Sequence, residues 1–268
     1  MADTTADIMA DITASITATA GSKNCTMLKI TDFHTHILPH VDDGSKNTEM
    51  SLSMLRSEAA QHVGCVVLTP HFYADRDTPE HFLQRRDEAL HHLRKAMEQQ
   101  TDLPKLVAGA EVAYYRGMSE SDALKKLCIG NSSYILVELP APPWKEYVYE
   151  ELLEIFRKLG LTPVIAHIDR YLPFWGADRI MERLAALPVL IQANSHFFTR
   201  AATASRALRM LQQGKIHLLG SDCHDLISRP PELGKAVERI KNRLGEEFLE
   251  QIVQNETKIL HNLCCTNV

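Results

Sequence analysis

Seven short apolar runs recur along this 268-residue chain, and each ends beside a polar side chain that can bind a hard metal ion or an anion. The gaps between the runs can hold one helix each, which is the pattern of consecutive βα units in a parallel barrel or sheet. Active sites of such barrels lie at the carboxyl ends of the strands, so these polar side chains are expected to converge on one mouth and form a metal site. The runs, with the residues that follow them, are 30–33 before His34 and His36, 66–70 before His71, 106–110 before Glu111, 135–137 before Glu138, 164–166 before His167, 189–193 before Asn194, and 217–221 before Asp222 and His224.

The composition favours a single α/β domain. With 45% hydrophobic and 24% charged residues, the chain can bury one sizeable core, and α/β barrels commonly use this length as one domain. Residues 1–26 are rich in Ala, Thr, Asp and Ser, a composition that does not offset the entropy of ordering a chain. We expect a disordered tail over 1–26 and one domain over 27–268. A start of translation at Met27 is a further hypothesis, which the intact mass of the native product would settle.

Charge and hydropathy argue against two classes of partner. The net charge of −5 provides no basic field for a phosphate backbone, so nucleic acid is not expected to bind. No apolar stretch is long enough to cross a bilayer, and Asp3, Asp7 and Asp11 stand where a signal peptide would need basic residues. The protein is expected to be cytoplasmic and not inserted in a membrane.

The segments between the apolar runs have helical patterns. Asn47 with Thr48, and Thr78 before Pro79, are candidate N-terminal caps, while Gly160 and Gly214 stand where helices are expected to end. The predicted helices are 49–62, 79–99, 119–127, 147–159, 177–187, 203–213, 231–243 and 246–259.

The H-x-H pair at the end of the first run is the first metal-binding signal. His34 and His36 are two residues apart on a predicted strand, so both rings should point to one face and bind one metal ion. Asp32 lies on the same face of this predicted strand, and its carboxylate is expected to orient the two rings without binding the metal itself. An isolated H-x-H pair is also common on an exposed strand edge. Glu111, Glu138 and His167 could each form a salt bridge at the mouth, but their recurrence at strand ends favours a metal centre.

The segment S-D-C-H at 221–224 could belong either to the metal centre or to a cysteine-dependent phosphatase site. The same alternation would place Asp222 and His224 at the mouth and turn Cys223 away from it. Cys223 and Arg229 also have the C-x5-R spacing of cysteine-dependent tyrosine phosphatases. The residues between them include no glycine, which such phosphate-binding loops typically use to present backbone N–H groups. We therefore interpret the C-x5-R spacing as a coincidence and Cys223 as a packing residue.

Several of these motifs, in this order, resemble the PHP (polymerase and histidinol phosphatase) superfamily. Within it, the chain is most similar to the tyrosine-protein phosphatases of bacterial capsule and exopolysaccharide loci, over about residues 28–260. The motifs are D-F-H-T-H-I-L-P at 32–39, D-D-G at 42–44, T-P-H at 69–71, G-A-E-V at 109–112, V-E-L-P at 137–140, P-V-I-A-H-I-D-R-Y at 163–171, Q-A-N-S-H at 192–196, S-D-C-H at 221–224 and S-R-P-P at 228–231.

The resemblance implies a distorted (βα)7 TIM-like barrel of the PHP type with up to three metal ions, usually Mn²⁺. Fe or Zn is the alternative, since imidazole and carboxylate ligands suit all three metals. Asp42 competes with Asp43 as a ligand. Arg170 and Arg229 match the phosphate-binding arginines of the family. The resemblance also implies which residues bind each ion. The first ion would be held by His34, His36, Glu111 and Asp222, the second by Glu111, Glu138 and His167, and the third by Asp43, His71 and His224.

Three hypotheses on function follow. The resemblance favours a metal-dependent phosphatase that hydrolyses phosphotyrosine on a bacterial tyrosine autokinase controlling polysaccharide export. A small-molecule phosphomonoesterase, such as a histidinol-phosphate phosphatase, is the alternative within the same superfamily. A metal-binding scaffold without activity is the third, but it would not need nine candidate ligands around an open centre.

Overall fold

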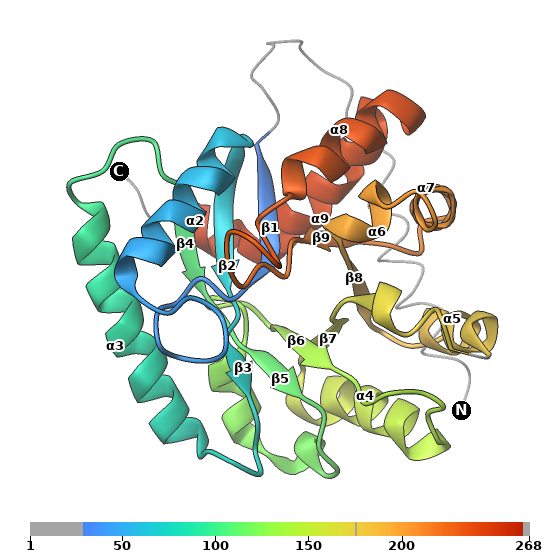
Figure 1. Cartoon of the computed structure of the whole chain (residues 1–268). Helices are drawn as coiled ribbons and strands as arrows, with labels where there is room; N and C mark the ends of the chain where they lie inside the picture. Colours follow the sequence, from blue (N-terminus) through green and yellow to red (C-terminus); the bar gives the residue numbers. More distant parts are fainter. Residues whose placement is uncertain (1–28, 175, 265–268) are drawn as a thin grey trace.

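The computed structural model describes residues 29–174 and 176–264 as a mixed α/β unit (Figure 1). The predicted tail at 1–26 and Met27 lie outside the described residues. Among the described residues, no helix is both long enough and apolar enough to cross a membrane.

All paired strands run parallel, as the spacing of the apolar runs predicts. One sheet has three strands in the order β1 (Ile30–Thr35), β2 (Val63–Leu68) and β4 (Lys105–Ala108). The other has six strands in the order β3 (His71–Phe72), β5 (Glu111–Ala113), β6 (Tyr134–Glu138), β7 (Thr162–Ile165), β8 (Leu190–Asn194) and β9 (Leu218–Gly220).

Two of the predicted runs are each split into two strands. β2 ends before Thr69 and Pro70, and proline has no N–H for a ladder hydrogen bond. β4 likewise ends before Gly109 and Ala110. His71 and Glu111 therefore open new strands instead of closing the preceding ones, and they are direct partners across the β3–β5 pair.

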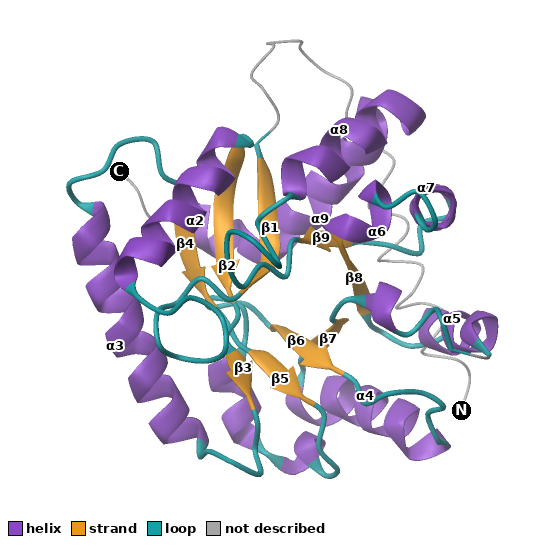
Figure 2. Ribbon diagram, viewed as in Figure 1, coloured by secondary structure: helices purple, strands orange, loops and turns teal. Residues whose placement is uncertain are grey.

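The two sheets approach each other between β1 and the segment after β9. The backbone N–H of Asp222 donates to His34 O at 2.7 Å, and that of His36 donates to Cys223 O at 2.9 Å. Together the two parallel sheets curl around the middle of the molecule, with the helices outside them (Figure 2). Phe33, Val67, Leu136, Val164 and Leu218, from five different strands, pack in one buried cluster.

Seven of the eight predicted helices are confirmed, with shifts at their ends. The Asn47 side chain accepts the Met50 N–H, the Thr78 side chain accepts the His81 N–H, and Gly160 ends a helix with a φ of 68°. The helices are α2 (Thr48–Ala60), α3 (Pro79–Met97), α4 (Glu146–Leu159), α5 (Ala177–Ala185), α7 (Ala204–Gln212), α8 (Leu233–Leu244) and α9 (Glu246–Cys264).

The other helical segments differ from the sequence-based expectation. The segment predicted as one helix at 119–127 forms two 3₁₀ helices, η1 (Met118–Glu120) and η2 (Asp122–Leu127), with Ser121 in an extended conformation between them. A short helix α6 (Ser195–Thr199) follows β8 where none was predicted, because five residues are too few to produce a recognisable period. A further 3₁₀ turn, η3 (Ile168–Arg170), follows β7.

Candidate metal centre

One buried carboxylate, Glu111, lies at the middle of a cluster of imidazoles. Its Oε2 is 3.1 Å from His34 Nε2, 3.3 Å from His36 Nε2 and 2.9 Å from His71 Nδ1. Its Oε1 is 2.9 Å from His167 Nε2. Glu111, His34 and His36 are fully buried. The ends of β1 and β7 and the starts of β3 and β5 therefore converge, and both oxygens of one carboxylate face ring nitrogens that can bind metal.

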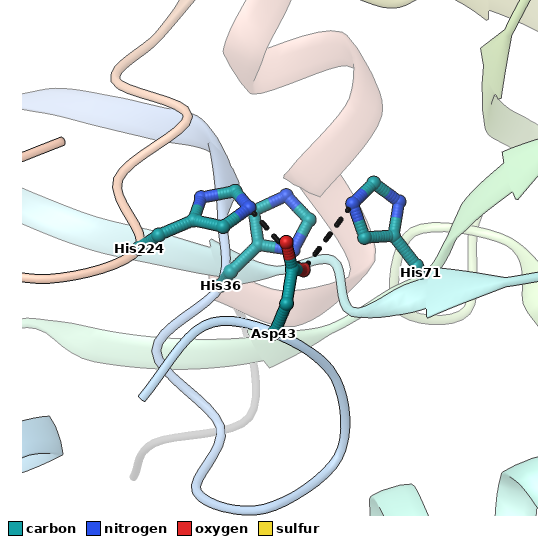
Figure 3. A group of neighbouring side chains, drawn as sticks. All are labelled: His36, Asp43, His71 and His224. Atoms are coloured by element: carbon teal, nitrogen blue, oxygen red, sulfur yellow. Dashed lines mark ion pairs between the residues drawn. The ribbon is translucent and has the colours of Figure 1, made fainter. Parts of the chain in front are cut away.

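A second group joins the loop after β1 to the segments around β3 and β9. His36, Asp43, His71 and His224 each offer one ligand atom, all within 4.8 Å of one another (Figure 3). Asp43 Oδ1 lies 3.5 Å from His224 Nε2 and 3.7 Å from His71 Nε2. The Asp43 side chain is 68% exposed, so this group is open to solvent on the side of the loop.

A third group is built around Glu138 at the end of β6. His71, Glu111 and Glu138 can together offer ligand atoms to one ion. Glu138 Oε1 lies 3.4 Å from His167 Nε2 and 3.5 Å from Arg170 Nη1. His167 has a φ of 33°, in the left-handed region that non-glycine residues rarely adopt, which is how the chain turns sharply after β7.

Asp222 connects the cluster to the two arginines predicted from the sequence. Its Oδ1 lies 3.4 Å from His36 Nε2 and accepts from Arg229 Nη2 at 2.6 Å. Arg170 Nη2 donates to Oδ2. β9 ends at Gly220, and Asp222 has a φ of 56°, so a turn and not strand alternation aims its side chain. Both guanidiniums are more than one third exposed, which leaves them accessible at the edge of the cluster.

The structure assigns different contacts to Asp42 and Asp43. Asp42 Oδ2 accepts from His36 Nδ1 at 2.6 Å and from the His71 N–H at 3.0 Å, while Oδ1 accepts from the Gly44 N–H. These bonds, against the opposing effect of burial, hold the pKa of Asp42 below its usual value. Asp42 thus orients an imidazole, and the neighbouring Asp43 carboxylate faces the ring nitrogens.

Asp32 does not orient the histidine rings, contrary to the sequence-based expectation. Its Oδ1 accepts from the backbone N–H groups of His34 and Ser221, and its side chain lies against Glu58 of α2. The register of β1 shifts between Asp32 and Thr35, so simple alternation fails at this point in the strand.

Two amides of β8 belong to the site: Asn194, which the sequence analysis placed at the mouth without a specific role, and Gln192, which it did not single out. Gln192 Oε1 lies 3.2 Å from His34 Nδ1 and accepts the His167 N–H at 2.6 Å. Asn194 Nδ2 donates to Asp222 Oδ2 at 2.9 Å. The alternation of two amides in the Q-A-N motif was the available sequence signal. It does not identify the residues that these amides contact. Such partners fix the orientation of metal ligands.

The donor chemistry of the cluster fits divalent metal ions. Glu111 Oε2 and His71 Nδ1 lie 2.9 Å apart, but neither of these buried atoms makes a hydrogen bond among the described residues, and His224 Nε2 makes none either. Unpartnered buried polar atoms are costly, and ions bound between them would remove that cost. Imidazole nitrogens and carboxylate oxygens are ligands for Mn, Fe and Zn.

The carboxylates of the cluster raise the pKa of two of its imidazoles. Burial opposes a charged imidazole, but hydrogen bonds to Glu111 and Glu138 raise the pKa of His167 to about 9. Burial is likewise outweighed at His36, whose hydrogen bonds to Asp222 and Asp42 raise its pKa well above the usual value. Metal ions would therefore have to displace protons from these rings.

Cys223 has none of the features of a nucleophilic thiol. It is fully buried between Asp222 and His224, and its backbone pairs with Thr35. Burial, together with the nearby carboxyl of Glu58, raises the pKa of the Cys223 thiol well above its usual value. A reactive cysteine needs partial exposure and a lowered pKa, so the packing role predicted for Cys223 agrees with its surroundings.

Comparisons with known proteins agree with this geometry. A family model for capsular polysaccharide synthesis, CpsB/CapC, matches residues 30–261. Tyrosine-protein phosphatase CpsB of Streptococcus agalactiae is 29% identical over 243 residues, covering 86% of this chain and 98% of that protein. Tyrosine-protein phosphatase YwqE of Bacillus subtilis is 28% identical over 238 residues, covering 86% of this chain and 91% of that protein.

A solved structure with the same fold comes from a crystallographic study of YwqE from Bacillus subtilis and CpsB from Streptococcus pneumoniae. That study describes the two proteins as metal-dependent tyrosine phosphatases. The match has a TM-score of 0.76 at 24% identity and covers 87% of this chain and 95% of the other.

Proposed function

Because the chain belongs to the capsular polysaccharide synthesis CpsB/CapC family, we propose that it is a metal-dependent protein-tyrosine phosphatase. The observation that carries the proposal is the position of Glu111, a buried carboxylate with four imidazoles around it and two accessible guanidiniums nearby. Such a cluster is suited to binding a phosphoryl group between metal ions and arginines.

The fold proposed for this activity is a distorted (βα)7 barrel that forms one domain over residues 27–268. β3 lies directly after β2 along the chain, and β5 directly after β4, so each pair would count as one bent strand. The contact between β1 and the segment after β9 would then bring the ends of the barrel together.

We assign nine ligands to up to three ions, with Mn²⁺ as the expected metal and Fe or Zn as alternatives. Glu111 would be shared between the first two ions, which agrees with its two oxygens facing different imidazoles. The first ion would be bound by His34, His36, Glu111 and Asp222, the second by Glu111, Glu138 and His167, and the third by Asp43, His71 and His224.

When bound, the ions would lower the pKa of a coordinated water, so that it could attack phosphorus at neutral pH, and would neutralise phosphate oxygens. Arg170 and Arg229 are placed to bind the outer phosphate oxygens and to stabilise the charge that develops on them during transfer. The phenol of tyrosine has a pKa near 10, so it leaves with less help from a general acid than an alkyl alcohol needs. The buried Cys223 thiol takes no part in this chemistry.

The proposed substrate is a phosphotyrosine protein, namely a bacterial tyrosine autokinase that controls capsule or exopolysaccharide synthesis. The names of the relatives support the tyrosine phosphatase activity, and the matching family model supports the link to capsule synthesis. The proposed location is the cytoplasm, where the phosphatase would encounter the domain of such a kinase.

A direct comparison of substrates tests this function. Purified protein loaded with Mn²⁺ should hydrolyse a phosphotyrosine peptide with a kcat/KM at least about tenfold above that for histidinol phosphate, a preference of about 1.4 kcal/mol. A preference for histidinol phosphate would instead identify a small-molecule phosphomonoesterase. Stoichiometric metal without turnover of either substrate would indicate a non-catalytic scaffold.

A further inference from the structure

A cleft of about 410 Å³ opens directly beside the metal centre. Asp43 and His71, two members of the centre, line it, and so do Val41, Tyr73 and Arg76. Pockets for small ligands commonly have volumes of about 300–1,000 Å³. The cleft therefore adds a place for a substrate group next to the position proposed for the phosphoryl group.

Aromatic and cationic side chains form a continuous wall of this cleft. The Tyr73 ring lies 5.3 Å from the His71 ring at an interplanar angle of 31°, and the Arg76 guanidinium carbon lies 4.7 Å from the Tyr73 ring centre. Both distances fall in the ranges of favourable ring–ring and cation–π contacts. The wall thus leads from a candidate metal ligand to an exposed cation.

Arg85 binds the nearby carboxylate of Asp77, and within the part of the chain that the structure describes Arg76 has no carboxylate partner of its own. Arg85 Nη2 donates to Asp77 Oδ2 at 2.6 Å, and its Nη1 donates to Val41 O at 2.9 Å. The Arg76 N–H donates to Tyr73 O, which closes a tight turn. Among the described residues, Arg76 has no carboxylate within ion-pair distance, so its guanidinium is available to a ligand.

We propose that this cleft binds the phenol ring of a phosphotyrosyl substrate, with Tyr73 and Val41 as its walls and Arg76 at its outer end. This proposal rests on the proposed function, and it makes Tyr73 and Arg76 the residues that select aryl over alkyl phosphates. A dry cavity of about 150 Å³ is enough to hold benzene, so a phenol ring fits the cleft by volume. The contact depends on the ring of Tyr73 and not on its hydroxyl.

Two phosphonates that differ only in the ring isolate this contact. Binding of phenylphosphonate and methylphosphonate to the Mn²⁺-loaded protein is measured by calorimetry, in wild type and in Tyr73→Ala, Tyr73→Phe and Arg76→Ala. Wild type and Tyr73→Phe should bind phenylphosphonate at least about tenfold more tightly than methylphosphonate. Tyr73→Ala should lose most of that preference, and Arg76→Ala should lose part of it.

A second arginine–tyrosine pair outside the cleft provides the matched control. The Arg116 guanidinium carbon lies 5.1 Å from the centre of the Tyr147 ring, which does not line the cleft. Tyr147→Ala should keep the wild-type preference. Turnover gives an independent reading, because Tyr73→Ala should raise the KM for phosphotyrosine about tenfold while kcat changes by less than about threefold.

The outcomes separate this inference from the proposed function. If wild type binds both phosphonates equally, or if Tyr73→Ala weakens both to the same extent, Tyr73 acts only through the fold and the inference is wrong. A Tyr73→Phe variant as impaired as Tyr73→Ala would also overturn it. If metal-loaded wild type does not hydrolyse phosphotyrosine at all, the proposed function fails, and the inference fails with it.

Discussion

At the scale of single residues, the account depends most on Glu111. It is fully buried, and its two oxygens face four imidazoles, all of which belong to predicted ligands. The contacts of Asp42, Gln192 and Asn194 then hold the surrounding groups in place.

Replacing Glu111 by Gln should lower both metal content and phosphatase rate. We expect the rate to fall by at least about a hundredfold, because even the outer partners of metal ligands contribute about 10–100-fold. Metal content by mass spectrometry and turnover of a phosphotyrosine peptide are the measurements. Glu182→Gln, on the exposed side of α5, is the control and should behave as wild type. Unchanged metal content and rate in Glu111→Gln would show that the shared ligand has been assigned to the wrong residue.

Replacing Cys223 by Ser distinguishes the metal-dependent mechanism from one in which Cys223 of the C-x5-R motif is the nucleophile. The buried thiol has a raised pKa, so we expect Cys223→Ser to keep the rate within about threefold once folding and metal content are verified. Asp222→Ala, next to it in the chain, should lose at least about a hundredfold. A dead Cys223→Ser variant with intact fold and metal, or a trapped phosphocysteine, would overturn the assignment.

At the scale of elements, the loop between β1 and α2 is positioned by a close backbone approach at Gly44. A Cβ added there would lie 2.1 Å from His36 O and 2.5 Å from the His36 Cβ. The D-D-G motif therefore requires glycine for a steric reason, because the loop that carries Asp42 and Asp43 must pass directly over the strand end.

Gly44→Ala should displace this loop. We expect a loss of about 1–3 kcal/mol in the free energy of unfolding, as for other overpacked sites, together with the loss of the ion assigned to Asp43. Denaturant unfolding and metal titration are the measurements. Gly64→Ala in β2 is the comparison, because its nearest contacts are all atoms of the flexible Lys29 side chain. Equal effects of the two substitutions would show that the close approach at Gly44 has no special role in positioning the loop.

The elements also show where prediction from sequence succeeds and where it fails. The parallel strands and the helix caps at Asn47 and Thr78 follow from local patterns, so they could be predicted. The register shift near Asp32 and the breaks before His71 and Glu111 depend on neighbouring strands, which one sequence does not display. For the same reason, the contacts that distinguish Asp42 from Asp43 could not be predicted, nor could the partners of Gln192.

At the scale of the whole molecule, metal binding should be coupled to proton release. The pKa of His167 is raised to about 9, so this ring carries a proton at pH 7 in the metal-free protein, and the raised pKa of His36 acts in the same direction. Because ligands must be deprotonated, Mn²⁺ affinity should rise with pH until it levels off near pH 9. Calorimetry at pH 7 in buffers of different ionisation enthalpy should show a net release of at least one proton per protein. An observed enthalpy that does not depend on the buffer would contradict the proposed arrangement.

The most direct test of the central claim is phosphotyrosine hydrolysis before and after removal of metal from one sample. The protein is chelated until its metal content is near zero, assayed, and assayed again after Mn²⁺ is returned. Activity should vanish on chelation and return with Mn²⁺, because both the attacking water and the charge on the phosphoryl group depend on the ions. Full activity in the metal-free sample would contradict the account.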